Sequence, residues 1–198
     1  MRRVHRGVPA CRDLPPPAAD APSDAPHADY GYQLSALADR TVLVDNNTWN
    51  NTHIATVGKA LCSNEEDGWH VLRKLDTDYV LVLFGGYIGF TGDDMNKLIW
   101  IIRISSGEYP EIQENNFLSQ GRLRVDDQAS KMLLDSLMYK LSYYNFHKGT
   151  MYTRGRGFDQ ARQVVAGREV TALTHFEEAF TTKNWLMRIY RVLPEPKA

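Results

Sequence analysis

Apolar and polar positions follow two different periods along this chain, and together they predict both strands and helices. Residues 79–84 form a continuous apolar run, which predicts a strand buried on both faces. Residues 93–105 instead carry apolar side chains at helical spacing, and Gly107 follows as a helix stop. Such alternation of helix and strand signals favours a mixed α/β fold, with a central mixed sheet flanked by helices.

Weaker signals predict the remaining elements. Ser63-Asn64-Glu65-Glu66 fits a capping box that starts a helix. Residues 108–129 and 146–168 show no clear period and are expected to be irregular. Further helices are predicted over 30–38, 52–61, 63–75 and 130–139 with a short helical turn at 176–180, and further strands over 41–44 and 186–192.

A change of composition divides the chain near residue 28. Residues 1–28 are rich in Pro, Ala, Asp and Arg and are expected to form a disordered tail, because they have little to bury. One domain is expected over 29–194, followed by a short tail, 195–198. The most apolar stretch, 79–90, is too short to span a bilayer and contains three glycines, so no transmembrane segment is predicted.

The composition excludes several classes of function. With 198 residues and a formal net charge of -1, the chain gives no reason to expect nucleic acid as a partner. Its two cysteines, Cys11 and Cys62, argue against a disulfide scaffold, and no Cys or His pair has zinc spacing. The six histidines are scattered, without an HExxH or GxSxG pattern, so no catalytic residue is assigned.

The glycine-rich segment 85–92 opens two interpretations. Glycines after a strand are typical of phosphate-binding turns, so a stand-alone α/β nucleotide-binding module is one alternative. Asp93 and Asp94 oppose it, because two carboxylates stand where a phosphate would bind. Asp94, Lys97 and Ile101 share one helix face by their spacing, which indicates either a surface ion pair above core residues or the edge of a small pocket.

Two short polar patterns complete the set of candidates. Asn46 and Asn50 each begin an Asn-X-Thr sequon in one loop, so both are candidate glycosylation sites, of which one is expected to be occupied. The tripeptide Asp29-Tyr30-Gly31 by itself indicates a helix N-terminus, since Asp accepts backbone N–H groups there.

Four blocks of sequence carry a resemblance to a known family, and they are DYGYQLSALADRTVLVDNNTWNNTHIATVGKAL, TDYVLVLFGGYIGFTGDDMNKLIWIIRI, LLDSLMYKLSYY and HFEEAFTTKNWLMRIYRV. In order and spacing they resemble the C-terminal lumenal domain of the catalytic subunit of the eukaryotic oligosaccharyltransferase. The resemblance runs from residue 29 to about residue 192, whereas the upstream tail resembles nothing in that family.

This resemblance implies an activity and its partners. The family is a glycosyltransferase that transfers an oligosaccharide from dolichyl diphosphate to the Asn of Asn-X-Ser/Thr sequons at the lumenal side of the endoplasmic reticulum membrane. The implied partners are an acceptor polypeptide, the dolichol-linked oligosaccharide and the other subunits of the complex. Mn²⁺ or Mg²⁺ is implied for the full-length enzyme, but no cofactor is expected in this chain. Because the catalytic acidic residues and metal ligands of the family lie in a multi-spanning part absent here, the isolated chain is expected to be inactive.

The resemblance also implies two groups of sequon-binding residues. Asp29, Tyr30 and Gly31 match the last three positions of a Trp-Trp-Asp-Tyr-Gly motif, with His27 and Ala28 in place of the two tryptophans. Asp29 keeps an acceptor for a Ser or Thr hydroxyl, but the two indole N–H donors are lost.

The second group lies in the predicted helix over 93–105. Asp94, Lys97 and Ile101 match an Asp-Lys-Ile motif, in which Ile101 would contact a threonine methyl group. Besides acceptor recognition, an inert, truncated gene product is a further alternative for the chain as a whole.

Overall fold

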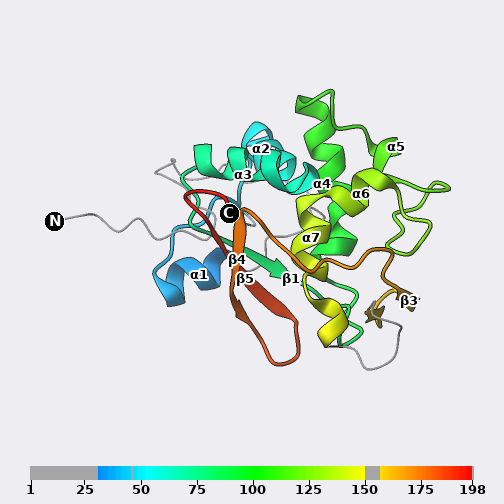
Figure 1. Ribbon diagram of the computed structural model, residues 1–198. Helices are drawn as coiled ribbons and strands as arrows, with labels where there is room; N and C mark the ends of the chain where they lie inside the picture. The colour runs from blue at the N-terminus through cyan, green and yellow to red at the C-terminus, as the bar shows by residue number, and fades with distance from the viewer. Residues whose placement is uncertain (1–30, 46, 150–156, 198) are drawn as a thin grey trace.

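A three-stranded sheet and a group of helices form the part of the protein that the structure, a computed structural model, describes: residues 31–45, 47–149 and 157–197 (Figure 1). The mixed α/β class is confirmed. The helices are α1 (Gly31–Ala38), α2 (Asn51–Cys62), α3 (Glu65–Lys74), α4 (Asp94–Glu108), α5 (Glu114–Phe117), α6 (Lys131–Asp135), α7 (Leu137–Tyr143) and the 3₁₀ turn η1 (Phe146–Lys148). The strands are β1 (Tyr79–Leu83), β2 (Phe158–Asp159), β3 (Val164–Val165), β4 (Phe176–Thr181) and β5 (Met187–Val192).

The named strands pair antiparallel, which refines the expected mixed sheet. The larger sheet has the order β1-β5-β4, and β2 pairs with β3 in a separate hairpin. Strand β1 therefore lies at an edge, and it is not buried on both faces, because half-buried Tyr79 and Leu81 alternate with buried Val80 and Val82. The continuous apolar run predicts the strand correctly, but both faces are buried only at its end, where Leu83 is buried beside Val82.

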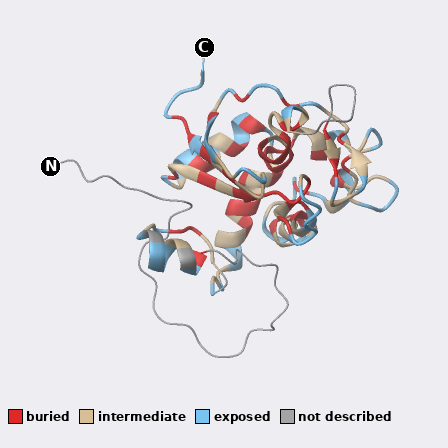
Figure 2. Cartoon of the chain, turned by 90° about the horizontal axis from the view of Figure 1, so that it is seen from below, coloured by how far each residue is buried: buried red, intermediate tan, exposed pale blue. Residues whose placement is uncertain are grey.

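Helices α2, α3, α4 and α7 gather beside this sheet and enclose the core, whereas α1 lies apart from them (Figure 1). Helix α2 packs against α3 and α4, and α7 contacts β1. Buried positions gather at the centre of the molecule, whereas most of α1 is exposed at its periphery (Figure 2). The central cluster includes Leu72, Val82, Leu98, Leu137 and Phe176.

Two predicted elements differ from the structure. The helical turn over 176–180 is wrong: this segment is strand β4, because Phe176 is buried in the core and the segment pairs with β5. In a run this short, pairing with a neighbouring strand decides the conformation. In the predicted strand 41–44, only Thr41 makes a bridge.

Buried Arg188 joins the sheet to the helices. Its guanidinium donates hydrogen bonds to the carbonyl oxygens of Leu141 (3.1 Å), Ser142 (2.8 Å) and Tyr144 (2.9 Å) at the C-terminal end of α7. The last carbonyl groups of a helix have no partner within the helix, so a buried helix end needs such donors. Burial lowers the pKa of Arg188 below the ordinary arginine value, and Glu178 on β4 partly offsets this with an ion pair of 3.2 Å.

Replacing this side chain tests its importance. We expect Arg188→Met to lower the free energy of unfolding by about 3–5 kcal/mol, because it leaves buried carbonyl groups without donors. Arg191→Met, on the same strand, removes the exposed ion pair with Glu177 and should cost less than about 1 kcal/mol. Urea denaturation measures both values, and equal losses in the two variants would contradict the assignment.

Close packing of α2 on α4 depends on a glycine. A Cβ atom at Gly58 would lie 2.2 Å from Oγ of Ser105 and 2.8 Å from Cγ2 of Ile101. Oγ of Ser105 in turn donates a hydrogen bond of 3.2 Å to the carbonyl oxygen of Ala55. The two helices therefore approach too closely for a side chain at position 58.

A matched pair of glycine substitutions distinguishes this packing from helix propensity. Gly58→Ala should destabilise the protein by roughly 1–3 kcal/mol, since α4 must move away. At Gly107 in α4 a Cβ atom would meet nothing within 4 Å, so Gly107→Ala should instead stabilise by roughly 0.5–1 kcal/mol. Thermal unfolding of both variants provides the measurement, and a shift of the same sign in both would refute the packing argument.

Candidate functional site

The N-terminal half of α4 carries the predicted Asp94, Lys97 and Ile101. Asp93 is the N-cap, and its Oδ1 accepts the N–H of Asn96 at 3.1 Å. Asp94 is the first helical residue, where a negative charge complements the helix dipole. The expectation that both aspartates open this helix is confirmed.

Both aspartates also hold the end of β1. Oδ2 of Asp94 accepts the N–H of Leu83 at 2.8 Å, and Oδ2 of Asp93 accepts the N–H of Gly85 at 2.9 Å. The side chain of Asp93 is fully buried, and Asp94 is half-buried. The position of the first turn of α4 is therefore fixed by the strand that precedes it.

Lys97 and Ile101 lie further along α4 in different surroundings. Lys97 is half-buried, and its N–H donates to the carbonyl oxygen of Asp93 at 3.2 Å. Ile101 is only partly accessible, because its side chain packs against the core and faces Gly58 of α2. Sequence spacing predicts that the three residues share a helix, but not that the side chain of Ile101 is partly buried against the core and partly accessible.

The glycine-rich loop does not provide a phosphate cradle. The carbonyl oxygen of Gly85 accepts the N–H groups of Ile88, Gly89 and Phe90 at 2.9–3.2 Å. The N–H of Gly85 itself binds Asp93. Since phosphate-binding turns need backbone N–H groups directed at the ligand, these contacts argue against the nucleotide-binding alternative.

A buried polar cluster beside this turn escaped the sequence analysis. Arg162, in the turn between β2 and β3, lies between the fully buried carboxylates of Asp93 and Asp159. The hydroxyl of Tyr143 donates to Asp159 at 2.5 Å. Burial, together with this nearby carboxylate, raises the pKa of Tyr143 well above its ordinary value. The pair at positions 159 and 162 has helical i,i+3 spacing, but no sequence signal connects it to position 93.

The other predicted sequon-binding group is described only in part. Asp29 and Tyr30 lie outside the described residues. Gly31 opens α1 and is buried, and a Cβ atom there would lie 2.4 Å from Cβ of Asp45. Glycine at this position therefore has a packing reason of its own, apart from any role in binding.

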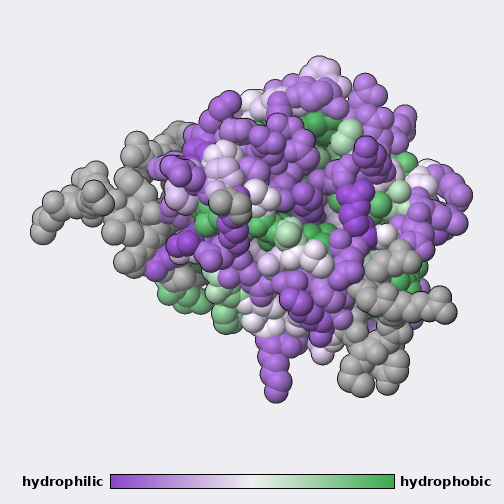
Figure 3. All heavy atoms as spheres, viewed as in Figure 1, coloured by the Kyte–Doolittle hydropathy of each residue, from purple (hydrophilic) through white to green (hydrophobic). Residues whose placement is uncertain are grey.

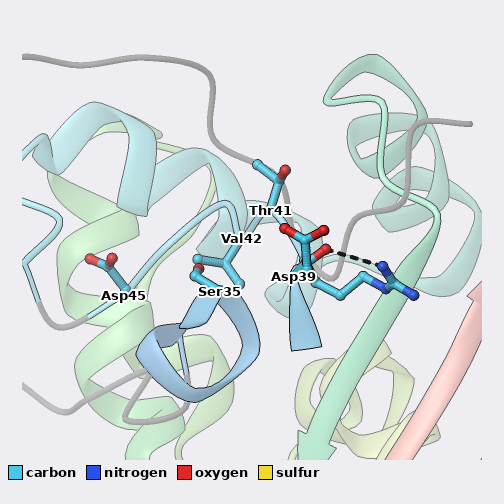
Figure 4. Close-up of a pocket in the computed structure, with 6 residues that line it drawn as sticks. Ser35, Asp39, Thr41, Val42 and Asp45 are labelled. Atoms are coloured by element: carbon cyan, nitrogen blue, oxygen red, sulfur yellow. Dashed lines mark hydrogen bonds between the residues drawn. The ribbon is translucent and has the colours of Figure 1, made fainter. Parts of the chain in front are cut away.

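An open pocket of about 350 Å³ lies beside α1 (Figure 4). Within it, Nη1 of Arg40 donates a hydrogen bond of 3.0 Å to the carbonyl oxygen of Asp39. Hydrophobic side chains are exposed over α1, at the lower left of Figure 3, including Leu37 at 85% exposure. The pocket is lined by Ser35, Asp39, Arg40, Thr41, Val42 and Asp45, which the sequence analysis did not select.

Of the two predicted glycosylation sites, Asn50 is described and Asn46 lies outside the described residues. Oδ1 of Asn50 caps α2 by accepting the N–H of His53 at 3.1 Å. Thr52, the hydroxyl residue of this sequon, is exposed in the first turn of α2. The cap uses the oxygen of the Asn50 amide and does not require its nitrogen.

Neither a metal centre nor a membrane span is found in the described part of the chain. Within residues 31–45, 47–149 and 157–197, no three His, Cys, Asp or Glu side chains are grouped so as to hold a metal ion. The donor set that the family's Mn²⁺ or Mg²⁺ would require is thus not met by these residues. None of the described helices is long and apolar enough to cross a membrane.

Comparison with known proteins connects the chain to one enzyme family. No protein-family model matches it. The STT3B subunit of dolichyl-diphosphooligosaccharide–protein glycosyltransferase from Arabidopsis thaliana is 53% identical over 167 residues, covering 84% of this chain and 23% of that protein. The STT3 subunit from Dictyostelium discoideum is 55% identical over 165 residues, and the one from Saccharomyces cerevisiae is 52% identical over 167 residues; each match covers 83% of this chain and 23% of that subunit.

Among solved structures, the C-terminal globular domain of oligosaccharyltransferase from Archaeoglobus fulgidus matches with a TM-score of 0.47 and 16% identity, covering 83% of this chain and 81% of that chain. We draw no conclusion from a structural likeness at this level. The sequence identities show homology, although the chain spans only 23% of the length of the three relatives. Over 83–84% of its length this chain is homologous to a segment of these STT3 subunits, a segment that makes up 23% of each of them.

Proposed function

We propose that this chain carries part of acceptor-sequon recognition in an oligosaccharyltransferase, and that it contains no catalytic centre. The observation that carries the proposal is its identity of 52–55% with the three STT3 subunits described above. In the full-length enzyme an oligosaccharide would pass from dolichyl diphosphate to the Asn of an Asn-X-Ser/Thr acceptor. The other subunits of the complex would be further partners.

The geometry of α4 supports a role in binding. A threonine side chain needs a hydrogen-bond partner for its hydroxyl and an apolar contact for its methyl group. The anchored first turn of α4 offers Asp94 and Lys97, and the accessible part of Ile101 offers apolar surface one turn further on. Asp29, Tyr30 and Gly31, the other group that the resemblance implies, would belong to the same function, although Asp29 and Tyr30 lie outside the described residues.

Catalysis would belong to another part of the full-length subunit. Transfer to an amide requires groups that activate the acceptor and stabilise the leaving diphosphate. The described residues offer no cluster for the Mn²⁺ or Mg²⁺ of the family, so no step of this proposal involves a metal here. The isolated chain would accordingly be inactive in glycan transfer, and it would lie at the lumenal side of the endoplasmic reticulum membrane.

Peptide titration of the isotope-labelled chain tests the proposal. An Asn-X-Thr peptide should bind with a dissociation constant no lower than roughly 1 mM, because one hydroxyl and one methyl contact cannot offset the ordering of a flexible peptide. NMR shifts should centre on Lys97 and Ile101 and be smaller with an Asn-X-Ala peptide.

The matched variants are Lys97→Gln, in the proposed site, and Lys131→Gln, which alters an exposed residue at the start of α6. Only the first should weaken the Thr-dependent shifts. Shifts that do not distinguish Thr from Ala peptides would sink the proposal and leave an inert fragment. Micromolar, Thr-dependent binding would show that the domain recognises sequons without the rest of the subunit.

Glycosylation of Asn50 can be tested separately from peptide binding. If the chain enters a secretory pathway, we expect a glycan on Asn50, because its capping oxygen leaves the amide nitrogen available and Thr52 is exposed. Intact-mass analysis should show one glycan, and Thr52→Val should abolish it while keeping the Asn50 cap. A protein unmodified at Asn50 would contradict the expectation, whereas Asn46 stays a prediction from sequence.

A further inference from the structure

Arg162 links two parts of the chain that are far apart in sequence. Its Nη1 lies 2.8 Å from Oδ2 of Asp159 in the same turn. Its Nη2 contacts Oδ1 of Asp93 and donates a hydrogen bond of 3.1 Å to Oδ1 of Asn96. The hairpin of β2 and β3 is thereby connected to the cap and the first turn of α4.

The charges of the cluster require a positively charged side chain at position 162. The side chains of Asp93 and Asp159 are fully buried, and that of Arg162 is 13% exposed, so two carboxylates share one guanidinium in a largely dry place. Burial opposes the charged form of Arg162, but Tyr143 and the two carboxylates outweigh it, and its pKa is raised. Without the guanidinium, the two buried carboxylates would face each other uncompensated.

The consequence of losing Arg162 should be confined to one end of α4. Asp93 accepts N–H groups from both Gly85 and Asn96, so a displaced Asp93 leaves, of the contacts described above, only the hydrogen bond between Asp94 and Leu83 to connect the first turn with β1. The C-terminal half of α4 is held separately by its contact with α2 at Ser105 and Gly58. The two ends of the helix therefore have independent anchors.

From these contacts we infer that Arg162 is a positioning residue, which fixes the first turn of α4 and with it Asp94 and Lys97 for contact with the acceptor hydroxyl residue. The contact with an acceptor rests on the proposed function, but the fixing of the turn can be measured without any peptide. Because Arg162 acts through Asp93, it needs no contact with the acceptor itself.

Amide hydrogen exchange on the full chain provides the first test. In Arg162→Met, protection at Leu83, Gly85 and Asn96 should fall by roughly five- to tenfold, the loss expected of a helix cap, while protection at Ser105 stays unchanged. Arg103→Met is the matched control, because Arg103 lies on α4 but pairs with Glu114 at the surface. That control should leave the amides of Leu83, Gly85 and Asn96 protected.

Peptide selectivity provides the second test. A residue with a structural role alone would lower stability without changing the preference for Asn-X-Thr over Asn-X-Ala peptides, whereas Arg162→Met should abolish that preference. Arg162→Lys keeps the charge and should restore part of the amide protection and part of the preference for Asn-X-Thr peptides. This variant also provides the test if Arg162→Met does not fold.

The outcomes separate this inference from the proposed function. Unchanged protection of the first turn in Arg162→Met, or loss of protection along the whole of α4, would overturn the positioning role. A wild-type chain that fails to distinguish the two peptides would overturn the proposed function instead. Arg162 would then fix the turn, as exchange shows, but not for an acceptor.

Discussion

The C-terminal end of α7 is buried, and its unpaired carbonyl groups must find donors there. Arg188, near the start of β5, supplies them to Leu141 and Ser142, and the hydroxyl of Tyr190 adds a second donor to Leu141 at 2.6 Å. Neighbouring positions on one strand thus fix where a helix ends against the sheet. Because an unsatisfied buried carbonyl costs about 1–3 kcal/mol, other arrangements of α7 on this sheet are disfavoured.

The same constraint explains which elements the sequence could predict. Helix α4 and strand β5 have strong periods of their own, and both lie close to their predicted positions. Strand β4 has five residues in common with the predicted helical turn, yet it is extended, because its backbone pairs with β5 and its Glu178 meets Arg188. Local sequence contains neither contact, so the prediction fails where long-range pairing decides the conformation.

The candidate site shows a similar division. The spacing of Asp94, Lys97 and Ile101 predicts one helix face, and the carboxylate of Asp93 predicts that the helix start does not bind phosphate. The structure gives the same carboxylate a second role, since Asp93 accepts the backbone N–H groups that a phosphate would need and holds the helix to β1. What spacing could not supply is the partner Arg162, 69 residues away, or the orientation of Ile101 toward Gly58.

If α4 contacts an acceptor as proposed, fixing its position would affect selectivity more than affinity. One hydroxyl hydrogen bond and one buried methyl group together contribute about 1.3–2.3 kcal/mol, which is roughly a ten- to fiftyfold preference for Thr over Ala. That preference exists only if the polar and apolar groups stay in fixed relative positions, because a mobile turn would follow either peptide. Asp93 fixes the N-terminal end of α4 to the sheet, and the absence of a side chain at Gly58 lets the C-terminal half of α4 pack closely on α2. The helix face between these two contacts is therefore held at both ends. On the proposed function, such a domain would discriminate between acceptor peptides while binding each of them weakly.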